Sequence, residues 1–141
     1  MNYRLVERMD DEHIPFITSK YELPAISRFF SIDEANYWQY VTAKDSARFY
    51  KIFENDCLAA TIHLELENRV LYMAIVVFPE YQKKGIATKV LKDIQENKLL
   101  SGFDKIHVSV DEENAASRKL FENAGFVCVG KDEELWEYEY I

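Results

Sequence analysis

The segment from Arg69 to Val110 constrains the fold of this chain more than any other. The strand predicted over Arg69–Phe78 carries the run VLYMAIVVF, which is apolar on both faces, as in a central strand covered on both sides. Pro79 ends this strand because proline cannot donate to a strand ladder. An amphipathic helical pattern starts at Gly85, and the run KIHVSV at Lys105–Val110 alternates again. We therefore expect a β-α-β unit whose two strands are parallel.

The remaining periodic segments complete a mixed α+β (α/β) pattern. Further strands are predicted at Tyr3–Met9, Arg48–Glu54, Cys57–Glu67, Phe126–Val129 and Leu135–Tyr140. Further helices are predicted from a cap at Asp10 or Asp11 to about Ser19, over Glu22–Ala43, and from the cap Asn114 to a left-handed C-terminal cap at Gly125. The order predicts one sheet with helices on both faces. Because no repeat or linker interrupts the sequence, we expect a single domain over residues 1–141.

Composition and charge limit the classes of partner. A chain of 141 residues, 48% of them hydrophobic, is large enough for one buried core. The formal net charge of −8 argues against nucleic acid as the main partner, because phosphate binding favours a basic surface. No window approaches the ~20 apolar residues of a membrane span, and the start MNYRLVERMDDE holds no signal-peptide run. We expect a cytoplasmic protein with neither a nucleic-acid nor a membrane partner.

The two cysteines carry no recognisable chemistry. Cys57 and Cys128 lie far apart, with no CxxC pair and no His cluster beside them. We expect both to be small buried residues in a reducing compartment, and we expect no metal site.

The loop inside the β-α-β unit combines basic and small residues. The first N–H groups of a helix have no partners within it, and with the helix dipole they attract anions. Gly85 permits a positive φ or the close approach of a phosphate, while Lys83 and Lys84 add positive charge. Gln82 can hydrogen-bond the loop or a ligand, and Ala87 keeps the next turn small. The loop predicts an anion site; an ordinary strand-to-helix turn that carries lysines is the alternative.

Two segments together resemble the GCN5-related N-acetyltransferase (GNAT) superfamily. Residues 82–87, QKKGIA, match its [QR]-x-x-G-x-[GA] motif, after the strand end Val77-Phe78-Pro79 and before a helix. Residues 114–126, NAASRKLFENAGF, are similar to its N-x-x-[SA]-x-x-x-[YF]-x-x-x-G-F segment. The resemblance covers roughly Cys57 to Gly130, and the first fifty residues fit the family only by the order of their elements.

The resemblance implies a GNAT-like acyl-CoA N-acyltransferase fold, with a central, mostly antiparallel sheet, a splayed parallel pair and helices on both faces. It implies acetyl-CoA as co-substrate, with the pantetheine arm along the strand that ends at Val77 and the pyrophosphate on the N–H groups of Lys83–Thr88. The implied cofactor-binding residues are Val76, Val77, Phe78, Gln82, Lys83, Lys84, Gly85, Ile86, Ala87, Thr88, Asn114, Ser117 and Phe121. The implied reaction is the direct attack of a primary amine on the thioester. The amine belongs to a small molecule or to a peptide.

Two positions depart from the family pattern. Phe121 stands where many members carry a tyrosine that can protonate the leaving thiolate, and Leu71 stands where some carry a glutamate base. An alkyl amine is mostly protonated at pH 7, and removing its proton costs roughly 4–5 kcal/mol. A substitute base is therefore expected. The candidates are His63 and Glu65, on one strand face, and Tyr72; surface or core positions without a catalytic role are the alternative.

The remaining aromatic residues leave two questions open. The aromatic helix predicted around Phe29–Tyr40 lies in the region that covers the acceptor in the resembling family, so acceptor lining and core packing both remain. Trp136, Tyr138 and Tyr140 alternate on the last strand, as core residues or as the surface of a homodimer. Two other functions also remain: a catalytically silent CoA-binding sensor or regulatory module, and a binding domain for another phosphorylated ligand.

Overall fold

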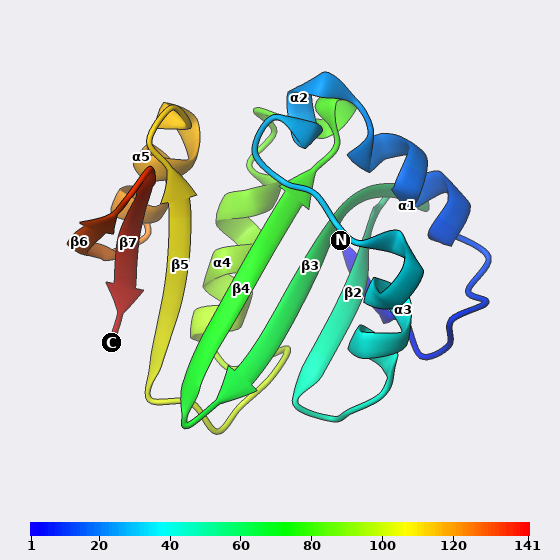
Figure 1. The fold of residues 1–141 in the computed structure, drawn as a ribbon, viewed down its shortest axis with the longest axis horizontal. Coiled ribbons are helices and arrows are strands. Elements are labelled where there is room, and N and C mark those ends of the chain that lie inside the picture. Colours follow the sequence, from blue (N-terminus) through cyan, green and yellow to red (C-terminus); the bar gives the residue numbers. More distant parts are fainter. The chain divides into compact units, whose positions relative to one another are not determined.

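The predicted mixed α+β class is confirmed by the structure, a computed structural model that describes residues 1–33 and 36–141 (Figure 1). Within these residues, seven strands form one sheet in the order β1-β2-β3-β4-β5-β7-β6. The strands are β1 (Asn2–Leu5), β2 (Ala47–Glu54), β3 (Cys57–Glu67), β4 (Val70–Val77), β5 (Lys105–Asp111), β6 (Val127–Asp132) and β7 (Leu135–Tyr140). The helices are α1 (Ile14–Tyr21), α2 (Pro24–Ser27), α3 (Glu34–Thr42), the 3₁₀ turn η1 (Pro79–Tyr81), α4 (Ile86–Gln95) and α5 (Ala115–Asn123).

The predicted parallel pair is present. β4 pairs with β5 in parallel, with the register running from Val70 opposite Lys105 to Tyr72 opposite His107. The pairs β1–β2, β5–β7 and β6–β7 are antiparallel. Between β3 and β4, Asn68 and Arg69 both have positive φ, at 51° and 64°. Two consecutive residues with positive φ form the tight turn that matches the twist of a β-hairpin.

The N-terminal predictions are partly wrong. The helix predicted over Glu22–Ala43 is interrupted: α2 and α3 are separate, and Leu23 is extended, with ψ at 137°. Pro24 explains only why α2 begins at residue 24, because proline pushes Leu23 before it out of the helical region. The predicted caps Asp10 and Asp11 are also wrong, since His13 is the N-cap residue of α1. The Asp11 carboxylate instead accepts a hydrogen bond from the backbone N–H of His13.

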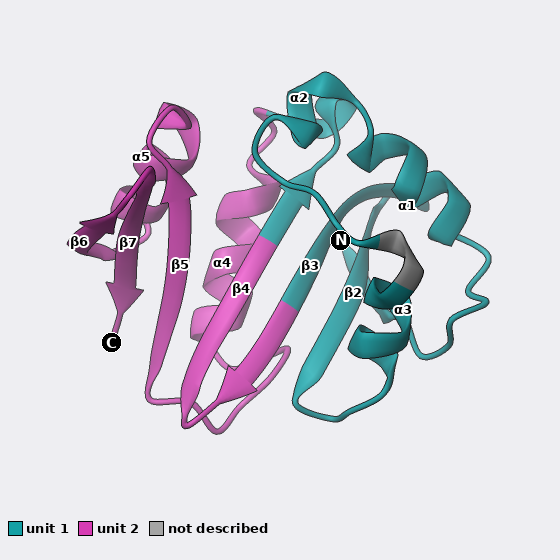
Figure 2. Ribbon diagram, viewed as in Figure 1, with its two compact units in different colours: residues 1–63, 75–82 teal, residues 64–74, 83–141 magenta. Residues whose placement is uncertain are grey.

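The chain divides into two compact units, which are described separately (Figure 2). The first unit comprises residues 1–63 and 75–82. Its core is rich in aromatic rings, and Trp38 packs against Phe49 with a ring-centroid distance of 4.9 Å. The buried cluster consists of Val6, Ile17, Tyr21, Ile26, Trp38, Val41, Phe49, Phe53, Leu58, Val76 and Phe78. For Trp38 the structure therefore favours core packing over acceptor lining.

The second unit comprises residues 64–74 and 83–141. The apolar stripe of α4 is buried, as predicted, at Ile86, Val90, Leu91 and Ile94. The end of α5 is a Schellman motif: the N–H of Gly125 donates to the Glu122 carbonyl and that of Phe126 to the Phe121 carbonyl. Gly125 has φ at 92°, which confirms the left-handed cap expected there.

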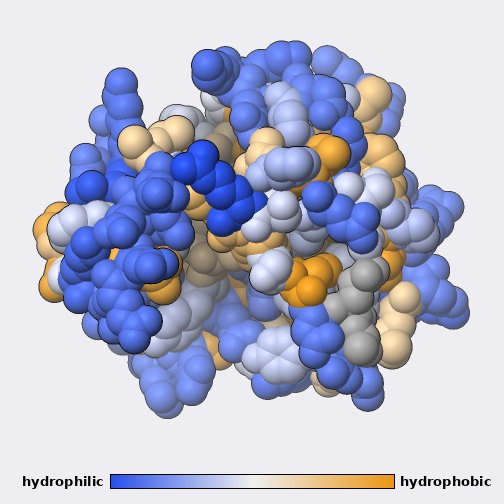
Figure 3. Space-filling view, turned by 45° about the horizontal axis from the view of Figure 1, so that its top comes forward, coloured by the Kyte–Doolittle hydropathy of each residue, from blue (hydrophilic) through white to orange (hydrophobic). Residues whose placement is uncertain are grey.

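The cysteine prediction is wrong, because Cys57 and Cys128 are both exposed. Cys57 is the first residue of β3, and Cys128 lies on the edge strand β6, whose residues are all exposed. Figure 3 shows one face of the molecule, on which hydrophilic side chains prevail and hydrophobic ones stand in small groups. Among the described residues, no helix is long and apolar enough to cross a membrane.

Candidate functional site

The loop before α4 has the backbone geometry of an anion site. Gly85 is the N-cap residue of α4, with φ at 81° and ψ at 7°. Gly85 has no side chain that could cap this helix end, and the N–H groups of Ile86, Ala87 and Thr88 in the first turn have no partner within the helix. Lys83 also has positive φ, at 62°. Left-handed residues at such turns direct successive N–H groups into one concavity, which attracts anions.

Glycine is needed at position 85 for its conformation. A Cβ built on Gly85 would meet no atom within 4 Å, so space does not require glycine there. The positive φ requires glycine, because L-residues are strained in the left-handed region. Gly85, Lys83 and Lys84 are all exposed. The loop thus presents two basic side chains to solvent.

The end of β4 offers its backbone for binding. The Phe78 N–H donates to the Ala59 carbonyl on β3, at 3.0 Å. Successive N–H groups of a strand point to opposite edges, so the Val77 N–H points away from β3. The Gln82 side-chain amide donates to the Val77 carbonyl at 3.1 Å. Gln82 therefore bonds the end of the strand that precedes its own loop.

The predicted residues of α5 lie in the second unit. Asn114 is the N-cap residue of α5, and its Oδ1 accepts a hydrogen bond from the Ser117 N–H at 3.2 Å. Phe121 is buried, with its ring centroid 5.2 Å from that of Phe126. The polar atoms of Asn114 and Ser117 are thus held at the start of α5. Phe121 lies further along the same helix and packs against Phe126.

The three predicted proton-transfer residues have different surroundings. His63 is half-buried, and its Nδ1 lies 2.9 Å from the Tyr37 hydroxyl on α3. Glu65 is half-buried on the same strand, and Tyr72 on β4 is exposed. Leu71 is fully buried, so the position of the family glutamate points into the core here. His63 thus has a polar partner 26 residues away in the sequence.

One cluster of titratable residues carries no sequence motif. In the second unit, Nδ1 of His107 lies 3.1 Å from Oε2 of Glu139, and Nε2 lies 3.4 Å from Oε2 of Glu137. The His107 bond, with a second bond from Lys105, holds the pKa of Glu139 below its usual value. The alternation of β5 and of β7 (KIHVSV and LWEYEY) could have indicated that these side chains share a face, but only the register brings them together. Among the described residues, no group of three or more His, Cys, Asp or Glu could hold a metal ion.

Comparison with known proteins points to one family. Residues 9–126 match the model described as "Acetyltransferase (GNAT) family". A curated relative, GCN5-related N-acetyltransferase 6, chloroplastic, from Arabidopsis thaliana, is 32% identical over 87 residues, which are 60% of this chain. The chain spans only 30% of the length of that relative.

Solved structures share the fold at low sequence identity. The GNAT domain of S. lividans PAT has a TM-score of 0.80 at 15% identity, covering 98% of this chain and 88% of that one. Spermidine N-acetyltransferase from Vibrio cholerae, in complex with CoA and spermine, has a TM-score of 0.78 at 20% identity, covering 98% and 92%. Campylobacter jejuni N-acetyltransferase PseH, in complex with acetyl coenzyme A, has a TM-score of 0.75 at 12% identity, and the match covers 99% of this chain and 98% of that one.

Proposed function

The chain belongs to the GNAT family of acetyltransferases, and from this we propose that it transfers an acetyl group from acetyl-CoA to a primary amine. The observation that carries the proposal is the start of α4, where N–H groups without partners inside the helix follow a left-handed Gly85 in a basic loop. Such a helix start fits a diphosphate, because uncapped N–H groups and the helix dipole both favour negative charge.

In this proposal the diphosphate of the acyl donor binds the N–H groups of Lys83–Thr88, with Lys83 and Lys84 adding charge. The backbone of Val76, Val77 and Phe78 lies along the pantetheine arm, and the groups that point away from β3 hydrogen-bond to it. Asn114, Ser117 and Phe121 contact the donor from α5. Bound in this way, acetyl-CoA supplies an activated acyl group, while the chain orients it.

The Val77 N–H has the direction required to stabilise negative charge. It points away from β3, whereas the Phe78 N–H is already used by Ala59. We assign to Val77 the donor for the thioester oxygen as negative charge develops on it, an interaction worth about 3 kcal/mol in comparable sites. The amine nitrogen forms the new bond to the acyl carbon, the carbon–sulfur bond breaks, and the thiolate takes up a proton.

The proton lost by the amine needs an acceptor, and His63 is the residue we propose first. Its ordinary range for proton exchange lies near neutral pH, and Tyr37 orients its ring through the 2.9 Å contact at Nδ1. Glu65 and Tyr72 remain candidates on the same grounds of residue type. The acceptor class is supported by the Vibrio cholerae relative, whose structure contains spermine, and by the net charge of −8, which favours a cation.

A silent CoA-binding module is the second candidate function. Phe121, which has no hydroxyl, and the buried Leu71 are the observations that favour it. Calorimetry with CoA and a thiol-release assay with acetyl-CoA separate the two functions. The amine panel should contain polyamines, a lysine peptide and a peptide with a free α-amine. Turnover with any of these supports the acetyltransferase, and CoA binding without turnover supports the silent module. No binding of CoA at millimolar concentration overturns both.

A further inference from the structure

A lysine on α1 contacts the segment between β4 and the candidate diphosphate loop. Lys20 Nζ donates to Oε2 of Glu80 in η1 at 2.6 Å. The Lys20 side chain is only 18% exposed, whereas that of Glu80 is 54% exposed. The hydrogen bond from Lys20 holds the pKa of Glu80 below its usual range. Sixty residues of sequence separate the two partners, so the contact is tertiary.

Two aromatic rings surround the same ammonium group. Lys20 Nζ lies 5.3 Å from the centroid of Phe16 and 6.0 Å from that of Phe78. The rings of Phe16 and Phe78 meet edge to face at 5.9 Å. Phe78 is fully buried and is the residue that follows β4. Cations are attracted to aromatic faces at these distances. Through Lys20, α1 therefore contacts both ends of the segment from Phe78 to Glu80.

The segment that Lys20 contacts has little regular structure of its own. Phe78 is extended, with ψ at 147°, η1 is a single turn, and Gln82 is extended again, with ψ at 157°. The hydrogen bonds recorded across this turn are Tyr81 N–H to the Phe78 carbonyl and Gln82 N–H to the Pro79 carbonyl, at 2.8 and 3.3 Å. Short 3₁₀ turns have poor hydrogen-bond geometry. Support from α1 therefore matters for the path of the chain between Val77 and Gln82.

We propose that Lys20 is a positioning residue for the acyl donor: through Glu80 and the rings of Phe16 and Phe78 it holds the turn that joins the pantetheine strand to the diphosphate loop. This inference rests on the proposed function of that strand and loop. It assigns a role to α1, a helix outside the segment in which the family motifs lie. Lys20 also neutralises Glu80, a carboxylate two residues before the anion-binding loop begins at Gln82.

Lys20 contributes by holding the turn and by neutralising Glu80, and four variants separate these two contributions. Lys20→Met removes both the bond and the neutralisation, and we expect the Kd for CoA to rise about three- to fivefold. Glu80→Gln removes the ion pair without leaving an unpaired carboxylate, so its effect should be smaller. Lys20→Arg keeps the positive charge, and the double variant Lys20→Glu with Glu80→Lys re-forms the ion pair in reverse. Both should have a Kd for CoA within twofold of that of the unmodified chain. The matched control is Arg69→Met, which breaks the exposed Arg69–Asp104 pair in the second unit.

Calorimetry with CoA, the KM for acetyl-CoA and the thermal unfolding midpoint are measured for each variant. The proposal expects Kd and KM to rise in Lys20→Met while kcat and the unfolding midpoint stay near those of the unmodified chain and of Arg69→Met. An unchanged Kd in Lys20→Met overturns it. A Kd that rises only together with a lower unfolding midpoint, without rescue by the charge swap, also overturns it. Failure of the unmodified chain to bind CoA refutes the proposed function instead.

Discussion

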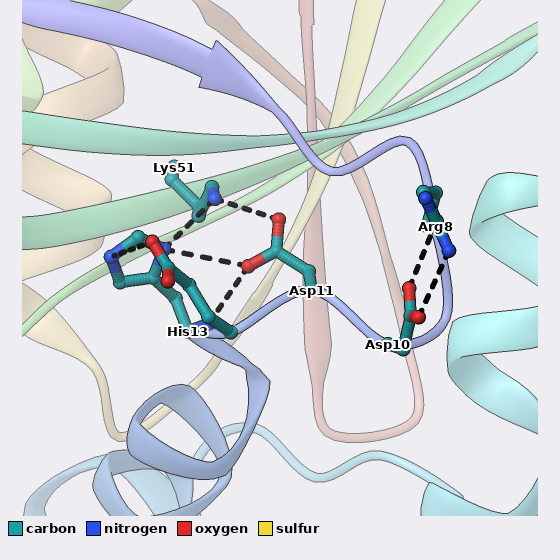
Figure 4. Close-up of polar contacts among 6 residues, drawn as sticks. Arg8, Asp10, Asp11, His13 and Lys51 are labelled. Atoms are coloured by element: carbon teal, nitrogen blue, oxygen red, sulfur yellow. Dashed lines mark hydrogen bonds and ion pairs between the residues drawn. The ribbon is translucent and has the colours of Figure 1, made fainter.

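The ammonium nitrogen of Lys51 lies 2.7 Å from Oδ2 of Asp11, and both side chains are nearly buried, at 7% and 12% exposure (Figure 4). The same nitrogen lies 2.9 Å from Nδ1 of His13. An ammonium group can only donate, so Nδ1 of His13 is the acceptor in this contact. The cluster joins the segment before α1 to the middle of β2, in the first unit. A neighbouring pair, Arg8 and Asp10, is exposed.

Acid should destabilise the protein through Asp11. Burial raises the pKa of this carboxyl, but the bonds from Lys51 and from the His13 N–H outweigh that effect and hold it below its ordinary 3.8. A carboxyl whose pKa is lower in the folded state contributes stability above its unfolded pKa and loses it as pH falls through the folded pKa. The urea midpoint of unfolding should therefore fall as pH drops below about 4. Asp11→Asn should lower the midpoint at pH 7 and flatten this dependence, and Asp10→Asn is the exposed control. An equally steep dependence in Asp11→Asn would contradict the assignment.

Gly85→Glu should weaken CoA binding by more than tenfold. The carboxylate repels the diphosphate, and the side chain is strained at a φ of 81°. Gly85→Ala introduces the strain without the charge and should have a smaller effect on calorimetric affinity. Gly130→Glu, on the exposed strand β6, introduces the same charge at an open position and serves as the control. Unchanged CoA affinity in Gly85→Glu would exclude this loop as the diphosphate site.

Val77→Pro should separate catalysis from binding. Proline removes the Val77 N–H, and because this group points away from β3, the β3–β4 ladder keeps its bonds. Loss of one oxyanion donor lowers kcat about 10²-fold or more in comparable sites. Single-turnover rates with acetyl-CoA are the measurement, and Val77→Ala, which keeps the N–H, is the control. If a folded Val77→Pro variant retains kcat within threefold, another donor stabilises the thioester oxygen.

His63→Gln should lower kcat/KM about 10²-fold if His63 accepts the proton of the amine. The affinity for CoA should not change, and the acidic limb of the pH profile of kcat/KM should disappear. Tyr37→Phe should shift that limb without removing it, because Tyr37 orients the ring rather than exchanging the proton. Glu65→Gln and Tyr72→Phe are measured in the same assay. A pH profile of His63→Gln that matches the unmodified chain would move the role to one of these residues.

Local patterns predicted the elements whose signals lie within a few residues. β3 and β7 begin and end at the predicted residues, and the cap at Gly125 follows from the residue type and its place after α5. The positive φ of Gly85 was also within reach, because glycine before an amphipathic run indicates a special backbone conformation. These features depend on steric limits that act within one turn or one strand.

Contacts between distant segments were beyond such patterns. Nothing near Asp11 in the sequence indicates that it pairs with Lys51 rather than capping α1, and nothing near Lys20 indicates Glu80. The exposure of Cys57 and Cys128 depends on which strand lies at the sheet edge and on which face is covered.

From β2 onward the sequence by itself determined the order of strands and helices, together with the parallel pair and the glycine turn before α4, because periodicity and backbone sterics are local. Tertiary structure alone decided which polar groups meet, such as His63 with Tyr37 and Lys20 with Glu80. Those pairings depend on strand register and on the packing of helices in the first unit, where apolar burial determines which distant side chains come within hydrogen-bonding distance.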